Sequence, residues 1–134
     1  MLETLSKCED VEDPVEHVEM LRQLRQEVQE SEEKVKLRRV FEAVGNPDRF
    51  AIVDLLRGHS LCVCELEAAL GKSQSTVSHH LRFLERAGLV RGWKKGKFTH
   101  YSLVEGAFKE FLRAVESWGS GVANWFSDAG EARG

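Results

Sequence analysis

The chain has 134 residues and a formal net charge of −3, with 42% hydrophobic and 31% charged residues. These values are typical of a soluble globular protein with one domain and appended arms. Because the sequence lacks a signal-peptide pattern and an apolar run of about twenty residues, we expect a cytoplasmic protein without membrane association. The signs of charge are segregated: residues 1–33 hold eleven acidic residues, whereas the centre of the chain is basic, which indicates nucleic-acid binding.

Residues 1–33 are predicted to form an acidic arm followed by a helix. Asp13, Pro14 and Glu16 stand in the order of a helix N-cap, a first-turn proline and a capping-box glutamate. A narrow apolar seam of roughly heptad spacing follows and suits packing against a partner chain. Its members are Val18, Leu21, Leu24 and Val28. The sequence leaves open whether this helix continues into the next one or restarts near Ser31.

Residues 34–103 are predicted to form a mainly helical DNA-binding domain. Asn46 and Pro47 repeat the cap-and-proline signature and open a helix. The apolar residues assigned to that helix are Phe50, Val53 and Leu56. Residues 61–70 are predicted to form a short helix closed by Gly71, and only two residues separate it from the next one. So short a connection predicts a helix-turn-helix motif.

The second helix of this pair, Ser73–Arg86, has the pattern of a recognition helix. Val77, Leu81 and Leu84 form an apolar stripe of helical period, and Gly88 is expected to end the helix in a left-handed conformation. Small hydroxyl, amide, imidazole and guanidinium groups occupy the polar positions, and such groups contact phosphates and base edges. The residues assigned to DNA binding are Ser73, Gln74, Ser75, Ser78, His79 and Arg82. A solvated amphipathic helix is the alternative.

A β-hairpin is predicted directly after this helix, with strands 89–95 and 97–103 on either side of Gly96. Its basic tip favours DNA binding and is expected to contact the flanking phosphates. The residues of the tip are Lys94, Lys95 and Lys97. We therefore predict a mainly α fold with a small β-hairpin wing, which is a winged helix-turn-helix.

Residues 104–126 are predicted to form a C-terminal amphipathic helix that joins two chains. Its apolar stripe consists of Phe108, Phe111, Leu112, Val115, Trp118 and Val122. Gly119 and Gly121 are expected to weaken the end of this helix, and residues 127–134 to form a frayed tail.

The tryptophans and the remaining histidines are interpreted as structural residues or as surface residues. The three tryptophans are assigned to the core or to the dimer interface. His80 flanks the apolar stripe of the recognition helix and is expected to pack against the scaffold. His17, His59 and His100 are expected at the surface, with His17 kept as a candidate outer ligand because it lies near Cys8 in the sequence.

Three cysteines in a chain without secretory features argue against a disulfide framework and favour a metal or redox role. Cys62 and Cys64 stand at the start of the first helix of the motif. Residues i and i+2 of a regular helix point about 200° apart, so both sulfurs reach one ion only where the turn is extended or distorted. The helix N-terminus is expected to favour the thiolate. Two thiolates bind a soft ion weakly, so a third ligand is expected, and Cys8 is the only other cysteine. The alternative to an ion site is that these residues are buried structural cysteines.

Five segments of the chain share their pattern with a known family. They are Val44–Phe50, Leu61–Leu66, Gln74–Leu81, Ala87–Val90 and Tyr101–Leu103. In these segments, and over about residues 34–118, the chain resembles the ArsR/SmtB family of metal-sensing winged-helix repressors. The resemblance implies a homodimer that binds double-stranded operator DNA when metal-free and dissociates from it when a toxic ion binds.

The resemblance also implies where the inducer binds. The family's arsenite and cadmium/lead sensors carry a Leu-Cys-Val-Cys sequence, which falls here on Cys62 and Cys64. Its cadmium/lead members add thiolates from an N-terminal arm, a role that would fall to Cys8. Since this arm has one cysteine, the resemblance favours three sulfurs, which suit As(III), Sb(III) or Pb(II), whereas Cd(II) would need an added oxygen or nitrogen ligand. The family's zinc site in the last helix is expected to be absent, because Glu105–Ser120 contains no histidine.

The sequence thus predicts a repressor released from its operator by arsenite or antimonite. A Cd(II) or Pb(II) sensor that uses the same site is one alternative, and a redox-sensing repressor of the same fold, whose cysteines oxidise, is another. An enzyme is not predicted, since the chain lacks a Gly-rich phosphate loop, a nucleophile–base spacing and paired catalytic acids.

Overall fold

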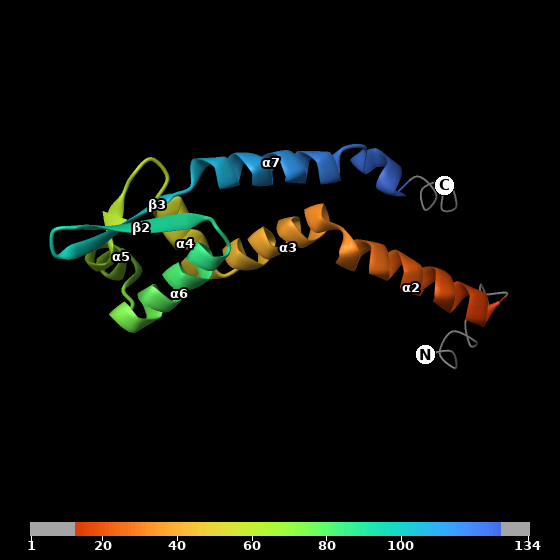
Figure 1. The fold of residues 1–134 in the computed structure, drawn as a ribbon, viewed down its shortest axis with the longest axis horizontal. Coiled ribbons are helices and arrows are strands. Elements are labelled where there is room, and N and C mark those ends of the chain that lie inside the picture. The colour runs from red at the N-terminus through yellow and green to blue at the C-terminus, as the bar shows by residue number, and fades with distance from the viewer. Residues whose placement is uncertain (1–12, 127–134) are drawn as a thin grey trace. The chain divides into compact units, whose positions relative to one another are not determined.

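The computed structural model describes residues 13–126, in which helices dominate and one small antiparallel sheet is present (Figure 1). Cys8 and the predicted tail at 127–134 lie outside the described residues. The chain divides into two compact units, Met1–Lys36 and Leu37–Gly134, and each is described by itself. Within the described range, no helix combines the length and the apolar character needed to cross a membrane.

The first unit contains helix α2 (Pro14–Glu30) and the start of α3 (Glu32–Val44). As predicted, the Asp13 carboxylate caps α2 by accepting hydrogen bonds from two N–H groups of the first turn, at 3.1 and 3.2 Å. Ser31 is extended, with ψ 115°, and its hydroxyl accepts a hydrogen bond from the Lys34 N–H at 3.3 Å. The helix therefore restarts at Ser31 rather than continuing.

The apolar seam of α2 is partly exposed. Val18 is buried, whereas Leu21, Leu24 and Val28 retain 44 to 50% of their accessible surface. Exposure of three aliphatic side chains on one helix agrees with a narrow seam and not with a core helix.

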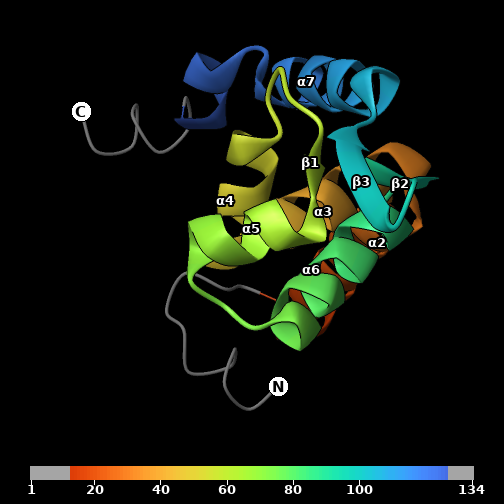
Figure 2. The same cartoon turned by 90° about the vertical axis from the view of Figure 1, so that its left-hand side faces the viewer.

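The second unit holds the remaining elements. After α3 these are α4 (Pro47–Leu55), β1 (Leu61–Cys62), α5 (Val63–Leu70), α6 (Gln74–Arg86), β2 (Val90–Lys95), β3 (Phe98–Leu103), α7 (Glu105–Gly119) and the 3-10 helix η1 (Val122–Phe126). The sheet is antiparallel with strand order β1-β3-β2. Helices α5 and α6 pack against one another beside this sheet (Figure 2). The predicted winged helix-turn-helix is therefore confirmed.

Local signals place the ends of these helices. The Asn46 side chain caps α4 by accepting hydrogen bonds from the N–H groups of Asp48 and Arg49 at 3.0 and 3.2 Å. Gly71 and Gly88 follow α5 and α6 with φ of 64° and 77°, the left-handed conformation in which glycine avoids a Cβ clash.

The core of the second unit lies between α4, α5, α6 and the sheet. Its buried members are Ala43, Ile52, Leu56, Leu66, Val77, Leu81, Leu84, Leu89 and Val90. The apolar stripe of α6 (Val77, Leu81 and Leu84) is therefore the buried face of this helix, as the sequence predicted. In α4, Ile52 is fully buried, whereas Phe50 is 60% exposed.

Two element boundaries also differ from the prediction. Residues 61–70 are not one helix, because Leu61 and Cys62 pair with Tyr101 and His100 of β3 and the helix begins at Val63. At the other end of the unit, α7 stops at Gly119, so that Val122 belongs to η1 and not to the long helix.

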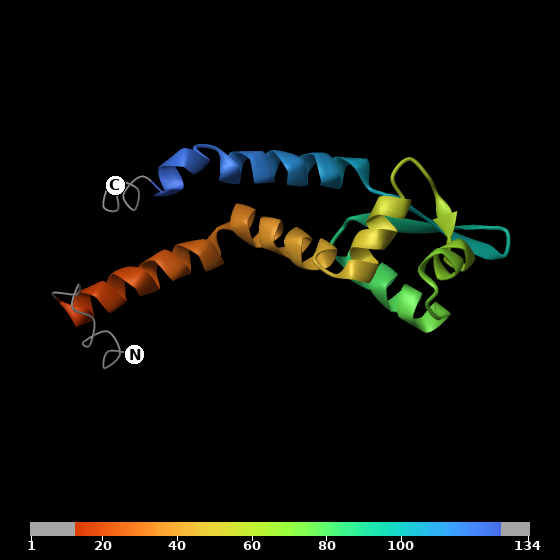
Figure 3. The ribbon, with the colours of Figure 1, turned by 180° about the vertical axis from the view of Figure 1, so that it is seen from behind.

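Helix α7 packs alongside the part of α3 that belongs to the second unit (Figure 3). The Phe41 ring makes edge contacts with Phe111 and Trp118, with ring centroids 5.3 and 6.3 Å apart. Trp118 also contacts Trp125, with the ring centroids 5.0 Å apart. These aromatic contacts fix α7 within the unit and leave Leu112 63% exposed.

Candidate DNA-binding surface and ion site

Helix α6 is amphipathic, and its polar face is turned to solvent. Val77, Leu81 and Leu84 on the opposite face are at most 1% exposed and anchor the helix in the core. The exposed residues from the predicted DNA-binding set are Ser73, Gln74, Ser75, His79 and Arg82, and Ser78 is half-buried. The structure thus brings the predicted set together on one side of the helix, where a recognition helix presents its side chains.

The hydroxyl of Ser73 already has a structural role. It accepts a hydrogen bond from the Thr76 N–H at 3.3 Å and lies 3.0 Å from the Thr76 hydroxyl oxygen and 3.2 Å from that of Ser75. A residue that satisfies the free N–H groups at a helix start stabilises the helix by about 0.5–2 kcal/mol. Ser73 therefore caps the N-terminus of α6. Because its hydroxyl is used in this cap, the residues that follow Ser73 are better placed than Ser73 itself to contact bases.

The wing carries a concentrated positive charge. Lys94 and Lys95 end β2 and Lys97 lies in the turn, and all three are exposed. Within residues 13–126, these lysines and Arg82 have no carboxylate within ion-pair distance. Cations that are not neutralised within the chain remain available to phosphates, so the exposed face of α6 and the wing tip together provide the candidate basic surface.

A half-buried polar network ties α6 to the end of α3 and the first turn of α4. Arg49 donates from Nε to the Ala43 carbonyl oxygen at 2.7 Å and from Nη2 to that of Glu42 at 3.3 Å. Its guanidinium also lies 4.0 Å from the centre of the Phe83 ring and 3.5 Å from His80 Nδ1. One arginine thus satisfies carbonyls at the end of α3 and contacts two side chains of the recognition helix.

This network fixes the orientation of the buried His80 ring. A guanidinium can only donate, so Nδ1 of His80 accepts from Arg49 and the ring proton lies on Nε2. Nε2 faces Asp48 Oδ2 at 3.4 Å. His80 packs against the scaffold as predicted, whereas the roles of Arg49 and Asp48 were not anticipated. The sequence predicted the neighbouring cap at Asn46, but no sequence pattern indicated that Arg49 and Asp48 contact α6.

Cys62 and Cys64 flank the junction of β1 and α5. Cys62 is extended, with φ −84° and ψ 165°, and precedes the first residue of the helix, while Cys64 is its second residue. Both thiols are free, Cys62 half-buried and Cys64 exposed. The extended backbone at Cys62 removes the regular helical spacing that would keep the two sulfurs apart, so the structure meets the condition set by the sequence.

The Glu65 side chain closes a reciprocal cap on this junction. Its carboxylate accepts a hydrogen bond from the Cys62 N–H at 3.0 Å, and the Cys62 thiol lies against the Glu65 N–H. That N–H lowers the pKa of the Cys62 thiol, but partial burial, the Glu65 carboxylate and the Cys64 thiolate together raise it above its ordinary value. The predicted preference for thiolate is therefore wrong at Cys62, because partial burial and the Glu65 carboxylate together outweigh the hydrogen bond from the Glu65 N–H.

The described residues contain two of the three sulfur ligands that the sequence predicted for a thiophilic ion. Among residues 13–126, no three His, Cys, Asp or Glu side chains are arranged to hold a metal ion. The thiols of Cys62 and Cys64 suit a soft ion in kind but not in number. The proposed third ligand, Cys8, lies outside the described residues.

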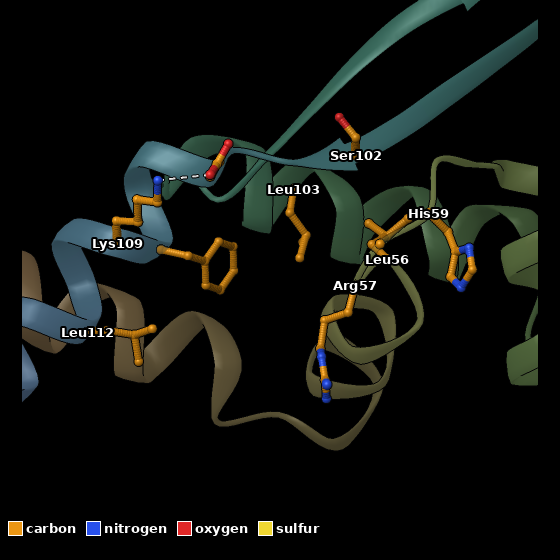
Figure 4. A pocket seen from close by; sticks show the side chains of 10 residues that line it. Leu56, Arg57, His59, Ser102, Leu103, Lys109 and Leu112 are labelled. Atoms are coloured by element: carbon orange, nitrogen blue, oxygen red, sulfur yellow. Dashed lines mark ion pairs between the residues drawn. The ribbon is translucent and has the colours of Figure 1, made fainter.

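A shallow cleft of about 570 Å³ lies elsewhere in the second unit, between the end of α4, the end of β3 and the start of α7 (Figure 4). Its walls include Leu56, Leu103 and Leu112, and Lys109 at its rim pairs with Glu105 at 2.9 Å. Its lining contains neither the two cysteines nor the α6 residues, so it is separate from the candidate sites.

The recognition helix packed on a second helix, with a basic hairpin beside it, defines a winged helix-turn-helix DNA-binding protein. The family model for bacterial regulatory proteins of the arsR family matches residues 46–91. An uncharacterized HTH-type transcriptional regulator of Methanocaldococcus jannaschii is 38% identical over 86 residues, covering 63% of this chain and 97% of the relative. The chain belongs to the arsR family of transcriptional regulators.

Further relatives and a solved structure agree with this family. The arsenical resistance operon repressor of Escherichia coli is 41% identical over 66 residues, covering 48% of this chain and 56% of the relative. A cadmium resistance transcriptional regulatory protein CadC homolog of Staphylococcus aureus is 32% identical over 82 residues, covering 60% of this chain and 68% of the relative. HlyU of Vibrio cholerae is 30% identical with a TM-score of 0.57, covering 66% of this chain and 96% of that chain.

Proposed function

We propose that this protein is a homodimeric repressor that leaves its operator when a thiophilic ion, arsenite or antimonite first of all, binds Cys62 and Cys64. The observation that carries the proposal is the position of these cysteines. Both lie at the junction of β1 and α5, where the first helix of the helix-turn-helix begins. The similarity to an arsenical resistance operon repressor supports this choice of ion.

DNA binding is proposed to use the two parts of the basic surface differently. Ser75, Ser78, His79 and Arg82 would enter the major groove together with Gln74, since residues near the start of a recognition helix reach base edges. Lys94, Lys95 and Lys97 would contact flanking phosphates, which give affinity without sequence preference.

The dimer is proposed to form through the apolar side chains left exposed on α7 and η1, together with the seam of α2. Trp118, Trp125 and Phe126 retain 49 to 63% of their surface, as does Leu112. So many exposed large apolar side chains are typical of an association surface. A two-fold protein would bind a pseudo-palindromic operator.

For ion binding, the two thiols would lose their protons and Cys8 would supply the third sulfur. Because protons compete with the ion, uptake should weaken as pH falls. A Cd(II) or Pb(II) sensor with the same ligands is the alternative, and the similarity to a CadC homolog supports it.

The proposal is tested by operator release from the reduced protein. A fluorescent duplex is first selected from a random pool by its affinity for the metal-free protein, and fluorescence anisotropy is then followed during titration with As(III), Cd(II), Pb(II), Zn(II) or peroxide. We expect release by As(III) at the lowest concentration. Release by Cd(II) or Pb(II) at lower concentrations would favour the alternative ion, and release by peroxide alone would show a redox sensor instead.

A further inference from the structure

Three side chains form a row across the outer face of the sheet. Cys62 of β1 pairs directly with His100 of β3, and His100 pairs with Trp93 of β2. Residues that stand directly opposite each other in antiparallel strands place their side chains on the same face. We call Cys62, His100 and Trp93 the wing row, because it runs from the Cys-Val-Cys segment to the base of the basic hairpin tip.

The contacts within the wing row are specific. The rings of Trp93 and His100 stack with centroids 6.2 Å apart and an interplanar angle of 25°. At the other end, the Glu65 carboxylate accepts a hydrogen bond from the Cys62 N–H at 3.0 Å. His100 thus stacks on Trp93 of the wing on one side and is the strand partner of Cys62 on the other.

The opposite face of the sheet is fixed to the core. Leu61 pairs with Tyr101 on that face, and Tyr101 pairs in turn with Gly92. A Cβ at Gly92 would lie only 2.7 Å from the Tyr101 ring, so this ring packs directly on the bare backbone of β2. A displacement of Cys62 is therefore more readily transmitted along the outer face than into the core.

Cys62 cannot move without disturbing β3. Its backbone belongs both to the β1–β3 ladder and to the cap of α5, whereas Cys64 lies wholly within the helix. Drawing the two sulfurs together must rotate the backbone between them, and a strand of only two residues has little pairing with which to resist. His100 is the residue that this rotation reaches first.

We propose that occupation of the Cys62–Cys64 site is transmitted to the DNA-binding wing through His100, whose stacking on Trp93 positions the Lys94–Lys97 tip. This inference rests on the proposed function of the two cysteines. His100 is assigned a positioning role and not that of a ligand, because its ring stacks on Trp93. The route runs through the sheet and does not require the connection between α5 and α6 to move.

The test separates ion binding from its transmission. Trp118→Phe and Trp125→Phe leave Trp93 as the single tryptophan of the chain. Because both positions belong to the proposed dimer surface, the sedimentation and the operator affinity of this background are first matched to those of the wild type. Arsenite is titrated into this reduced background while As–thiolate absorption reports binding, Trp93 emission reports the wing, and anisotropy of labelled DNA reports release. All three signals should change over the same arsenite range.

His100→Ala should keep the As–thiolate titration within about twofold of the background and lose the Trp93 response. The ratio of operator affinities without and with arsenite should then fall from the five- to 150-fold range usual for such coupling to about twofold or less. His100→Phe, which can stack but cannot bind an ion, should restore both effects. His59→Ala, an exposed histidine outside the wing row, serves as the matched control and should behave as the background does.

Each other outcome overturns the inference in a recognisable way. An unchanged affinity ratio in His100→Ala means that transmission takes another route, and weakened As–thiolate absorption in that variant means that His100 is a ligand. Absence of As–thiolate absorption in the background contradicts the proposed function itself. Should His100→Ala fail to fold, hydrogen exchange of the Cys62 and His100 amides decides, because the inference requires faster exchange when arsenite is bound.

Discussion

Arg49 joins the end of α3 to the recognition helix through a single guanidinium group. It satisfies two backbone carbonyls and contacts His80 and Phe83 of α6. Buried or half-buried acceptors that lose their donor keep the full cost of desolvation, which is about 1–3 kcal/mol. The same contacts set the position of α6, so the residue should affect both folding and DNA binding.

We therefore predict that Arg49→Leu lowers the free energy of unfolding by about 1–3 kcal/mol and weakens operator binding. Urea unfolding and DNA anisotropy measure the two effects. Arg57→Leu is the matched control, because Arg57 pairs with Asp54 on the surface with a side chain 75% exposed, and such a pair contributes at most about 1 kcal/mol. Equal losses in the two variants would contradict the role assigned to Arg49.

A second residue-scale prediction concerns Glu65. Its carboxylate helps to raise the pKa of the Cys62 thiol, since a negative neighbour disfavours the thiolate. Glu65→Gln keeps an acceptor for the Cys62 N–H but removes the charge, so the thiol should titrate at lower pH. Ultraviolet absorbance of the thiolate, measured in Cys8→Ser/Cys64→Ser so that Cys62 is the one remaining cysteine, gives the direction of the pKa change. A pKa that stays or rises in the glutamine variant is the contrary result.

At the scale of elements, the wing and the recognition helix should differ in their salt dependence. Replacing Lys94, Lys95 and Lys97 with glutamine should weaken binding to all sequences and flatten the plot of log affinity against log salt by about 0.9 for each phosphate that the wing no longer neutralises. The control is the double variant Arg57→Gln and Lys109→Gln, whose cations are already paired within the chain. A salt slope that the triple variant leaves unchanged would remove the wing from the DNA-binding surface.

Sequence reasoning succeeded where the cause of an element is local. The caps at Asp13, Asn46 and Ser73 lie within three residues of the groups they satisfy, so α2, α4 and α6 begin where they were predicted. Strand β1 was missed because its two residues are extended only through pairing with β3, almost forty residues later. No local signal announces such a pairing, and the run from Leu61 to Leu70 is apolar enough to suggest one helix.

The site shows the same division. The exposed face of α6 follows from helical period alone. The raised pKa of Cys62 depends in part on the Glu65 carboxylate, whose side chain turns back to accept a hydrogen bond from the Cys62 N–H. The stacking of Trp93 on His100 depends on the register of β2 and β3. Trp93 was accordingly assigned to the core or a dimer interface, although it lies 38% exposed on the wing.

At the scale of the whole molecule, the exposed apolar face of α7 should hold two chains together. Leu112 is the best probe, because it is 63% exposed, whereas Phe111 already contacts Phe41 within the chain. Leu112→Asp should therefore give a folded monomer at micromolar concentration, as measured by analytical ultracentrifugation with circular dichroism to check the fold. Ser117→Asp, on the other side of α7, should remain dimeric. A wild-type chain that sediments as a monomer would exclude this assembly.

Cys62 and Cys64 are proposed to connect the binding of an ion to the release of DNA. The most direct measurement is operator anisotropy during arsenite titration of the reduced wild type and of Cys62→Ser/Cys64→Ser. The double variant should bind the operator as the wild type does and remain bound at arsenite concentrations that release the wild type. Cys8→Ser should need more arsenite but still respond. If the double variant leaves the operator at the wild-type arsenite concentration, the sensing site lies elsewhere and the account is wrong.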